Sequence, residues 1–324
     1  MVRSQHRWVG TPDRNGAAHM ESTMTALRIL RGIEFARPQN ADPLLLDLYL
    51  PEGSHQTTVA EGPQPGRPAV VHFHGGGWRT GERSSLGPIV DGFALSPIGQ
   101  LVDAGFVVAS ADYRLSSVAT FPAQLLDAKA AVRWLRGHAA DYGIDPGRIY
   151  AWGDSAGGHL AALLGLTPGS TIFAEPGTDA AQGAGDDAVA GVAAWYPPTD
   201  LERMGHQARP DAVASADDPG SREALLIGAQ PADAPQKAKA ASPLTYVHPD
   251  APPFLLIHGT ADRFVPAAQS ASLAEALERA GNDVELLLLE DADHMWSTPD
   301  GGSGAAEQAT SATIDFLRRQ AEQH

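Results

Sequence analysis

Ser155 lies in the stretch Gly-Asp-Ser-Ala-Gly, with one glycine two residues before it and another two residues after it. The apolar run 148–152 precedes this stretch and the small and apolar run 158–164 follows it, which predicts a strand, a sharp turn and a helix. A serine on such a turn has a strained backbone, so side chains larger than glycine beside it would collide. The pattern predicts a nucleophilic serine; a plain helix cap is the alternative interpretation.

A second glycine-rich motif, His-Gly-Gly-Gly-Trp at residues 74–78, follows the predicted strand 68–73. Acyl transfer places negative charge on the carbonyl oxygen in the transition state, and preorganised backbone amides stabilise that charge. We therefore predict an oxyanion hole made by the N–H groups of Gly75, Gly76 and Ala156. A flexible turn is the alternative interpretation of these glycines.

The predicted serine needs two partners. A serine hydroxyl is a poor nucleophile at neutral pH and needs a base, which in turn needs a carboxylate to hold its tautomer. Asp262 closely follows the predicted strand 254–257, and His294 follows the predicted strand 284–289. Both positions keep the chain order serine, acid, histidine. Asp262 is the predicted acid and His294 the predicted base, with Asp200 as the alternative acid.

The chemistry that these residues predict is acyl transfer. Ser155 would attack a carbonyl carbon while His294 takes its proton, and water would then hydrolyse the acyl-enzyme. No cofactor is required. His72 and His74 would share one face of a strand and could form a metal pair. No third ligand stands at a telling spacing, so we predict no metal site.

These side chains need a scaffold that gathers the ends of several strands. Apolar segments typical of strands alternate along the chain with segments at helical spacing. This alternation predicts an α/β fold with a mostly parallel central sheet and helices on both faces. The predicted strands are residues 27–35, 44–50, 68–73, 105–111, 148–152, 188–195, 254–257 and 284–289, and the predicted helices are 122–138, 158–164, 267–280 and 305–319.

The domain organisation is simple. Residues 1–28 are polar and without periodicity, so we predict a flexible N-terminal tail there, followed by a single catalytic domain at 29–324. Two stretches rich in small, polar and proline residues, 168–187 and 201–240, interrupt the alternation. We interpret them as long surface loops. The second, between about 200 and 240, is the candidate for a small cap over the site.

Composition excludes several classes of protein. The 324 residues include 39 acidic and 23 basic side chains and no cysteine. The net charge of −16 would repel nucleic acid and anionic lipid surfaces, and the lack of cysteine excludes disulfides and a thiol nucleophile. No apolar run is typical of a membrane span or a signal peptide. We expect a cytoplasmic protein with no nucleic-acid or membrane partner; the sequence allows a homo-oligomer.

The motifs at 74–78 and 153–158 resemble those of bacterial esterases of the hormone-sensitive-lipase-like group, and the resemblance covers most of the chain. Segments 112–115, 121–123 and 252–259 resemble that group as well. The N-terminal residues are unsuited to the helical cap of many members, so the chain looks closer to the compact branch with feruloyl-esterase-like and acetyl-xylan-esterase-like enzymes. The resemblance implies the α/β-hydrolase fold and carboxylesterase activity.

Aromatic side chains stand near the ends of several predicted strands and could surround the site. Each could equally be a core residue, because aromatic side chains fill cores generally. They indicate a small ester substrate, with a short acyl or aryl group, rather than a long-chain lipid. Hydrolysis of amide-type bonds, as by an aryl formamidase or a peptidase, uses the same triad and is the alternative function; a binding module on this fold is a third. The five candidate pocket residues are Trp78, Trp195, Tyr196, Phe264 and Trp296.

Overall fold

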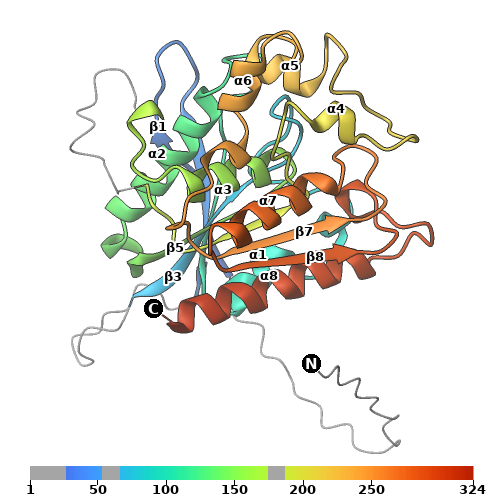
Figure 1. Ribbon diagram of the computed structural model, residues 1–324. Helices are drawn as coiled ribbons and strands as arrows, with labels where there is room; N and C mark the ends of the chain where they lie inside the picture. The colour runs from blue at the N-terminus through green and yellow to red at the C-terminus, as the bar shows by residue number, and fades with distance from the viewer. Residues whose placement is uncertain (1–26, 53–65, 174–186, 324) are drawn as a thin grey trace, which may run out of the picture.

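The computed structural model describes residues 27–52, 66–173 and 187–323 (Figure 1). One eight-stranded sheet runs through this part, in the order β1-β2-β4-β3-β5-β6-β7-β8. The first three strands in this order pair antiparallel, and all further pairs are parallel. The strands are β1 (Leu27–Ala36), β2 (Leu44–Pro51), β3 (Arg67–Phe73), β4 (Val107–Ala111), β5 (Ile144–Asp154), β6 (Val192–Trp195), β7 (Phe254–Gly259) and β8 (Val284–Leu289).

Helices cover both faces of the sheet, and a separate apolar cluster fills each interface. Because parallel strands under two helical layers are buried on both sides, they read as continuous apolar runs, and every residue of β4, β6 and β7 is buried. The predicted α/β fold is therefore confirmed. On one face lie α2 (Ala123–Gly137), α3 (Ala156–Leu166) and α7 (Ala268–Arg279), and on the other lie α1 (Pro97–Asp103) and α8 (Gly304–Gln323).

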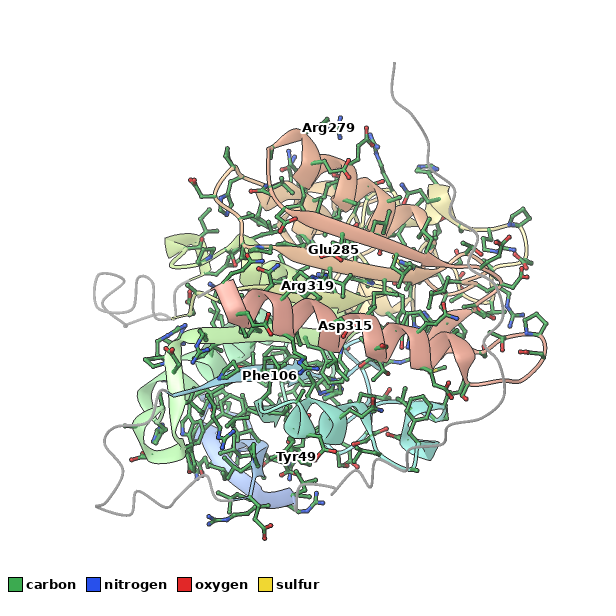
Figure 2. The ribbon with its side chains drawn as sticks, turned by 90° about the horizontal axis from the view of Figure 1, so that it is seen from below. Tyr49, Phe106, Arg279, Glu285, Asp315 and Arg319 are labelled. Atoms are coloured by element: carbon green, nitrogen blue, oxygen red, sulfur yellow. The ribbon has the colours of Figure 1, made fainter. Side chains whose placement is uncertain are left out.

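Figure 2 shows the second face, with α8 lying across the sheet. Phe316 and Leu317 of α8 are buried against the sheet, and Arg319 pairs with Glu285 of the edge strand β8 at 2.6 Å. Burial of the apolar stripe, with the ion pair at its exposed margin, fixes α8 on the sheet. None of the described helices is both long enough and apolar enough to span a bilayer.

Three predictions of element boundaries need correction. β1 begins at Leu27, so the predicted tail of 1–28 is wrong at its last two residues; residues 1–26 lie outside the described residues. Helix α1 was not predicted, because residues 86–103 show no long periodic run. Of the predicted loop 168–187, the described part contains the short 3-10 helix η3 (Thr171–Phe173), and 174–186 lie outside the described residues.

We refer to the other predicted loop, residues 201–240, as the cap segment. It contains three short helices, α4 (Met204–Gln207), α5 (Arg222–Ile227) and α6 (Pro235–Ala240), where a loop was expected. Figure 1 shows them together above α7 and β7. Short helices carry too few turns to show a hydrophobic period, which is why the sequence pattern did not indicate them. The remaining 3-10 helices are η1 (Val90–Gly92), η2 (Ala140–Tyr142), η4 (Pro243–Tyr246) and η5 (His294–Trp296).

The cap segment is tied to the sheet domain by buried polar contacts. The Gln269 side chain on α7 accepts hydrogen bonds from the backbone N–H groups of Thr199 and Asp200, at 2.6 and 2.7 Å. Its amide donates to the Gln207 side chain of α4 at 2.6 Å. These bonds hold the start of the cap segment against α7, so that its helices keep a defined position over the sheet.

Candidate active site

Ser155 stands at the junction of β5 and α3, with the backbone dihedral φ at 51°. Its N–H donates to the carbonyl of Trp195 at 2.8 Å, which holds the turn. A Cβ atom on Gly153 would collide with the backbone of Gly157, and one on Gly157 would collide with the carbonyl of Phe73. The two glycines are therefore required by the close approach of β3, β5 and α3 around a strained serine.

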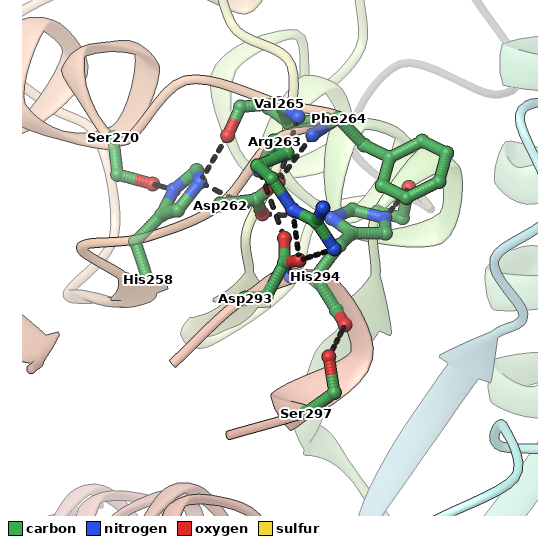
Figure 3. A network of polar contacts seen from close by, with 10 residues as sticks. His258, Asp262, Arg263, Phe264, Val265, Ser270, Asp293, His294 and Ser297 are labelled. Carbon is green, nitrogen blue, oxygen red and sulfur yellow. Dashed lines mark hydrogen bonds and ion pairs between the residues drawn. The ribbon is translucent and has the colours of Figure 1, made fainter. Parts of the chain in front are cut away.

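The structure brings Ser155, His294 and Asp262 together from the ends of three strands. The His294 Nε2 atom lies 3.1 Å from the Ser155 hydroxyl, and its Nδ1 atom lies 2.7 Å from Asp262 Oδ2. Ser155 and His294 are each 8% exposed, whereas Asp262 is buried. Figure 3 shows His294 beside the Asp262 carboxylate, and His294 also lines the cavity. The arrangement matches the hydrogen-bond chain that activates a serine.

Asp262 is held by more than the histidine. Its Oδ1 atom accepts hydrogen bonds from the backbone N–H groups of Phe264 and Val265, both at 2.8 Å. Burial by itself would raise the pKa of Asp262, but hydrogen bonds from His258 and His294 outweigh burial and hold the pKa well below its ordinary value. The carboxylate is therefore charged and fixed in orientation.

His258, at the end of β7, is a neighbour of this carboxylate that was not among the predicted site residues. Its Nε2 atom lies 2.8 Å from the carbonyl of Val265 and 3.4 Å from Asp262 Oδ2 (Figure 3). Both of these atoms are acceptors, so Nε2 carries the proton, and Nδ1 accepts from the Ser270 hydroxyl at 2.7 Å. The ring thus donates toward the same carboxylate oxygen that lies beside His294.

Asp200, the alternative acid, pairs elsewhere. Its carboxylate accepts a hydrogen bond from the backbone N–H of Arg203 at 3.3 Å and lies 3.8 Å from the Arg203 guanidinium. Asp262 is the carboxylate hydrogen-bonded to His294, and the geometry therefore favours Asp262 over Asp200.

The glycine loop after β3 lies beside the cavity over Ser155. Gly76 and Gly77 line the cavity with Ser155, whereas Gly75 packs against the Asp154 carboxylate and is not part of the cavity lining. Ala156 is the first residue of α3, so its N–H has no intrahelical acceptor. The geometry favours Gly77 over Gly75 as a donor of the oxyanion hole. The sequence does contain a signal for Gly77, since it is the third glycine of the same run.

The side chains of the two histidines considered as a metal pair have other partners. His72 Nδ1 lies 2.9 Å from the Ser110 hydroxyl, and His74 Nδ1 lies 2.7 Å from the carbonyl of Gly75. Burial lowers the pKa of His74 below its ordinary value. Within residues 27–52, 66–173 and 187–323, no three His, Asp or Glu side chains are grouped so that they could hold a metal ion.

The cavity over Ser155 has a volume of about 180 Å³. Two of the five predicted pocket aromatics, Trp78 and Phe264, line it. The Trp78 indole N–H donates to His159 Nδ1 at 3.2 Å, and His159 Nε2 lies 2.7 Å from the carbonyl of Ala241. Burial lowers the pKa of His159 to about 4, so the ring is neutral and fixes Trp78 as a rigid wall.

The other three predicted pocket aromatics do not line the cavity. Trp195 and Trp296 are about 1% exposed and meet edge to face, with 5.4 Å between ring centroids, in the apolar cluster between the sheet and α8. The Trp195 indole donates to Thr313 of α8 at 2.8 Å. Tyr196 is also 1% exposed and packs its ring 4.5 Å from His294. The prediction is wrong for these three, because their side chains point into the core.

The cap segment completes the cavity. Met204 of α4, together with Arg222 and Glu223 of α5, lines it opposite the strand ends. Ser221 accepts a hydrogen bond from the N–H of Ala224 at 3.0 Å and thereby caps the start of α5. Burial raises the pKa of Glu223 above its ordinary value. No sequence pattern pointed to these residues, since their placement depends on how the cap segment folds over the sheet.

The chain is similar to several proteins that are named as esterases. The family model BD-FAE matches residues 46–277. Esterase LipQ of Mycobacterium tuberculosis is 34% identical over 260 residues, covering 78% of this chain and 56% of LipQ. Esterase LipC of the same organism is 28% identical and covers 94% of this chain and 77% of LipC. The chain thus spans little more than half the length of LipQ.

Two solved structures share the fold. A truncated carbohydrate esterase from gut microbiota is 29% identical with a TM-score of 0.73, covering 93% of this chain and 98% of that one. The esterase Est2 of Thermogutta terrifontis is 29% identical with a TM-score of 0.65, covering 92% of each chain. Together with the sheet order and the BD-FAE match, these findings show that the chain has the α/β-hydrolase fold and belongs to the BD-FAE family of hormone-sensitive-lipase-like esterases.

Proposed function

We propose that this protein is a serine carboxylesterase that hydrolyses small carboxylic esters through an acyl-enzyme. The observation that carries the proposal is the continuous hydrogen-bond chain from Asp262 through His294 to Ser155, which opens on a cavity. A hydroxyl, an imidazole and a buried carboxylate in this geometry are the groups that acyl transfer needs.

In the proposed reaction the Ser155 hydroxyl attacks the ester carbonyl while His294 Nε2 takes its proton. Asp262 holds the imidazole in the tautomer with the proton on Nδ1 and stabilises the imidazolium that forms. His294 then gives the proton to the leaving alcohol. A water molecule then attacks the acyl-enzyme while His294 takes its proton. His294 returns this proton to the Ser155 oxygen as the carboxylic acid leaves.

The negative charge on the tetrahedral intermediate requires donors. We assign this role to the N–H groups of Gly76, Gly77 and Ala156. The two glycines line the cavity beside Ser155, and Ala156 is the first residue of α3, so its N–H has no acceptor within the helix. Loss of a single donor in such a hole reduces kcat by about 10²- to 10³-fold.

The size of the cavity supports a small substrate. A cavity of about 150 Å³ accommodates a benzene molecule, and the cavity over Ser155 measures about 180 Å³. One short acyl chain or one aromatic ring fits in this space, between Trp78 and Phe264. The cap segment, with Met204 above the site, limits the length of the acyl group that can enter.

The proposal favours esters over amides. LipQ, LipC and Est2 are named as esterases, and Est2 has also been solved phosphorylated by paraoxon. None of these names supports the amide alternative. A cytoplasmic location and a homo-oligomeric state stay predictions, which cell fractionation and sedimentation would check.

The experiment is hydrolysis of 4-nitrophenyl esters from acetate to decanoate, alongside an anilide and an aryl formamide, by wild type and Ser155→Ala. We expect maximal kcat/KM at short acyl chains, slow anilide turnover, and a loss of about 10⁵-fold or more in Ser155→Ala. Unchanged turnover in Ser155→Ala would refute the mechanism, and an anilide hydrolysed faster than the esters would replace the esterase assignment with an amidase.

A further inference from the structure

An arginine of the cap segment faces the cavity over Ser155. The aliphatic part of Arg222, the first residue of α5, packs against the α-carbon of Gly77, where a Cβ atom would collide with Arg222 Cδ. Its guanidinium lies over the ring of Phe264, with 5.0 Å between the guanidinium carbon and the ring centroid. Contacts on two sides therefore hold this half-buried cation at the cavity wall.

This cation has no carboxylate partner in the described part of the chain. Most arginines on the surface pair with an acidic side chain, as Arg203 does with Asp200, in a chain with an excess of 16 acidic groups. Neither Arg222 nor Arg79, which also lines the cavity, lies within 4.0 Å of a carboxylate among the described residues. Two positive charges thus line the cavity without an ion pair among the described residues, and Arg222 acts on its neighbour Glu223 only at longer range.

Neither acidic group of the cavity forms an ion pair with Arg222 or Arg79. Glu223 is only 3% exposed, and burial raises its pKa against the opposite effect of Arg222. Asp154 lies beside Ser155, where its carboxylate packs against Gly75. Phe264 excludes water from one face of the Arg222 guanidinium, which strengthens the attraction of that group for an anion.

We propose that Arg222, assisted by Arg79, selects esters that carry a carboxylate within the same small molecule, on either the acyl or the alcohol side of the scissile bond. The planar guanidinium binds a carboxylate through two parallel hydrogen bonds, whereas a neutral amide of the same shape gains only one weaker contact. The inference rests on the proposed esterase function and adds a substrate class to it.

The test compares esters that differ only by a carboxylate or a carboxamide. On the acyl side the pair is monomethyl succinate and methyl succinamate, and on the alcohol side it is 4-acetoxybenzoate and 4-acetoxybenzamide. For the wild-type chain we expect kcat/KM for the carboxylate to exceed that for the carboxamide by about tenfold in one of the pairs. The pair that shows the preference identifies the side of the ester that Arg222 reaches.

Arg222→Gln should reduce this ratio about tenfold, to near unity, and Arg222→Lys should retain part of it. Arg203→Gln is the matched control, because it removes the same charge from the cap segment at a side chain that is 70% exposed and is not part of the cavity lining. It should leave the ratio as in wild type. The wild-type ratio should also fall between 50 and 500 mM NaCl, a measurement that does not depend on the folding of any variant.

Ratios near or below unity for both pairs in wild type, or a preference that survives in Arg222→Gln, would overturn the inference. If neutral esters are hydrolysed in a Ser155-dependent manner while no carboxylate preference exists, only this inference fails. Absence of turnover for every ester would instead count against the proposed function.

Discussion

The loops that follow β3, β5, β7 and β8 differ from the cap segment in how strictly the structure limits which residue types each position can hold. In the strand-end loops, backbones approach so closely that single residue types are required, as at Gly157 against the carbonyl of Phe73. The cap segment has short helices and side-chain contacts, and it contributes Met204, Arg222 and Glu223 to the same cavity. The difference suggests a division of roles: the strand ends position the reacting groups, and the cap segment determines what they act on.

The largest effect that could test this division concerns the two candidate acids. Asp262→Asn should reduce kcat by about 10⁴-fold, because an amide in that position favours the wrong histidine tautomer. Asp200→Asn, near the start of the cap segment, should reduce kcat by less than about tenfold. Steady-state kinetics on 4-nitrophenyl acetate measure both variants, and the opposite ranking would contradict the assignment of the acid.

A second test compares two glycines through stability. Gly157→Ala should lower the free energy of unfolding by about 3 kcal/mol or more, because the new methyl group meets backbone that cannot move aside. Gly228→Ala, after α5, should cost only about 1 kcal/mol, for its positive φ and a contact of 3.1 Å with Thr120.

Urea unfolding followed by circular dichroism measures both glycine variants. Gly220→Ala serves as the control, since nothing lies within 4 Å of a Cβ atom there and its φ is not positive. Equal losses of unfolding free energy in Gly157→Ala and Gly228→Ala would contradict the comparison, because the strand-end loops would then tolerate substitution as well as the cap segment does.

The third test uses pH. The folded state lowers the pKa of Asp262 below 3.8 and raises the pKa of Glu223 above 4.5. The folded chain therefore binds fewer protons at Asp262 than the unfolded chain, and more at Glu223. The contribution of Asp262 to stability is complete above pH 3.8 and is lost as the pH falls further, whereas Glu223 costs stability as the pH rises above 4.5.

Unfolding free energies of wild type, Asp262→Asn and Glu223→Gln, measured between pH 3 and 7, would check both signs. The disadvantage of Asp262→Asn should begin to shrink as the pH falls below 3.8 toward pH 3. Glu223→Gln should gain on wild type above pH 4.5, with a slope of at most about 1.4 kcal/mol per pH unit. Parallel curves for the three proteins would show that neither carboxyl titrates differently in the folded state.

The smallest effect concerns acyl-chain length. Met204→Ala removes side-chain atoms from the cavity wall and should raise the kcat/KM of longer acyl chains by about fourfold per accommodated methylene, which corresponds to about 0.8 kcal/mol. Leu225→Ala is the control, since Leu225 on α5 is 39% exposed and is not part of the cavity lining. An unshifted optimum in Met204→Ala would place the limit on chain length elsewhere.

The same division explains what the sequence could predict. Eight strands were located from apolar runs, and the signal is continuous where strands such as β6 and β7 are parallel and buried. The predicted roles of Ser155, Asp262 and His294 follow from chain order at strand ends. The pocket was predicted less well. Phe264 and Trp195 both stand near strand ends, but one lines the cavity and the other is buried against α8, and alternation along the chain cannot tell these outcomes apart.

The cap residues lay beyond prediction for a different reason. Arg222 belongs to a cap segment whose start is anchored by Gln269 and Ser242, through contacts about 40 to 70 residues apart in sequence. Such long-range contacts leave no local pattern. Gly77 could have been found, since its N–H belongs to the same glycine run as that of Gly76.

The positive φ of Ser155 has a consequence for how this fold can lose its chemistry over time. A residue in that conformation costs of order 1–3 kcal/mol unless it is glycine. Replacement of Ser155 by glycine would therefore remove the proposed nucleophile and relieve the strain in the same step. In a duplicated copy of the gene that is no longer selected for hydrolysis, this single substitution would raise the stability of the fold and remove the proposed esterase activity.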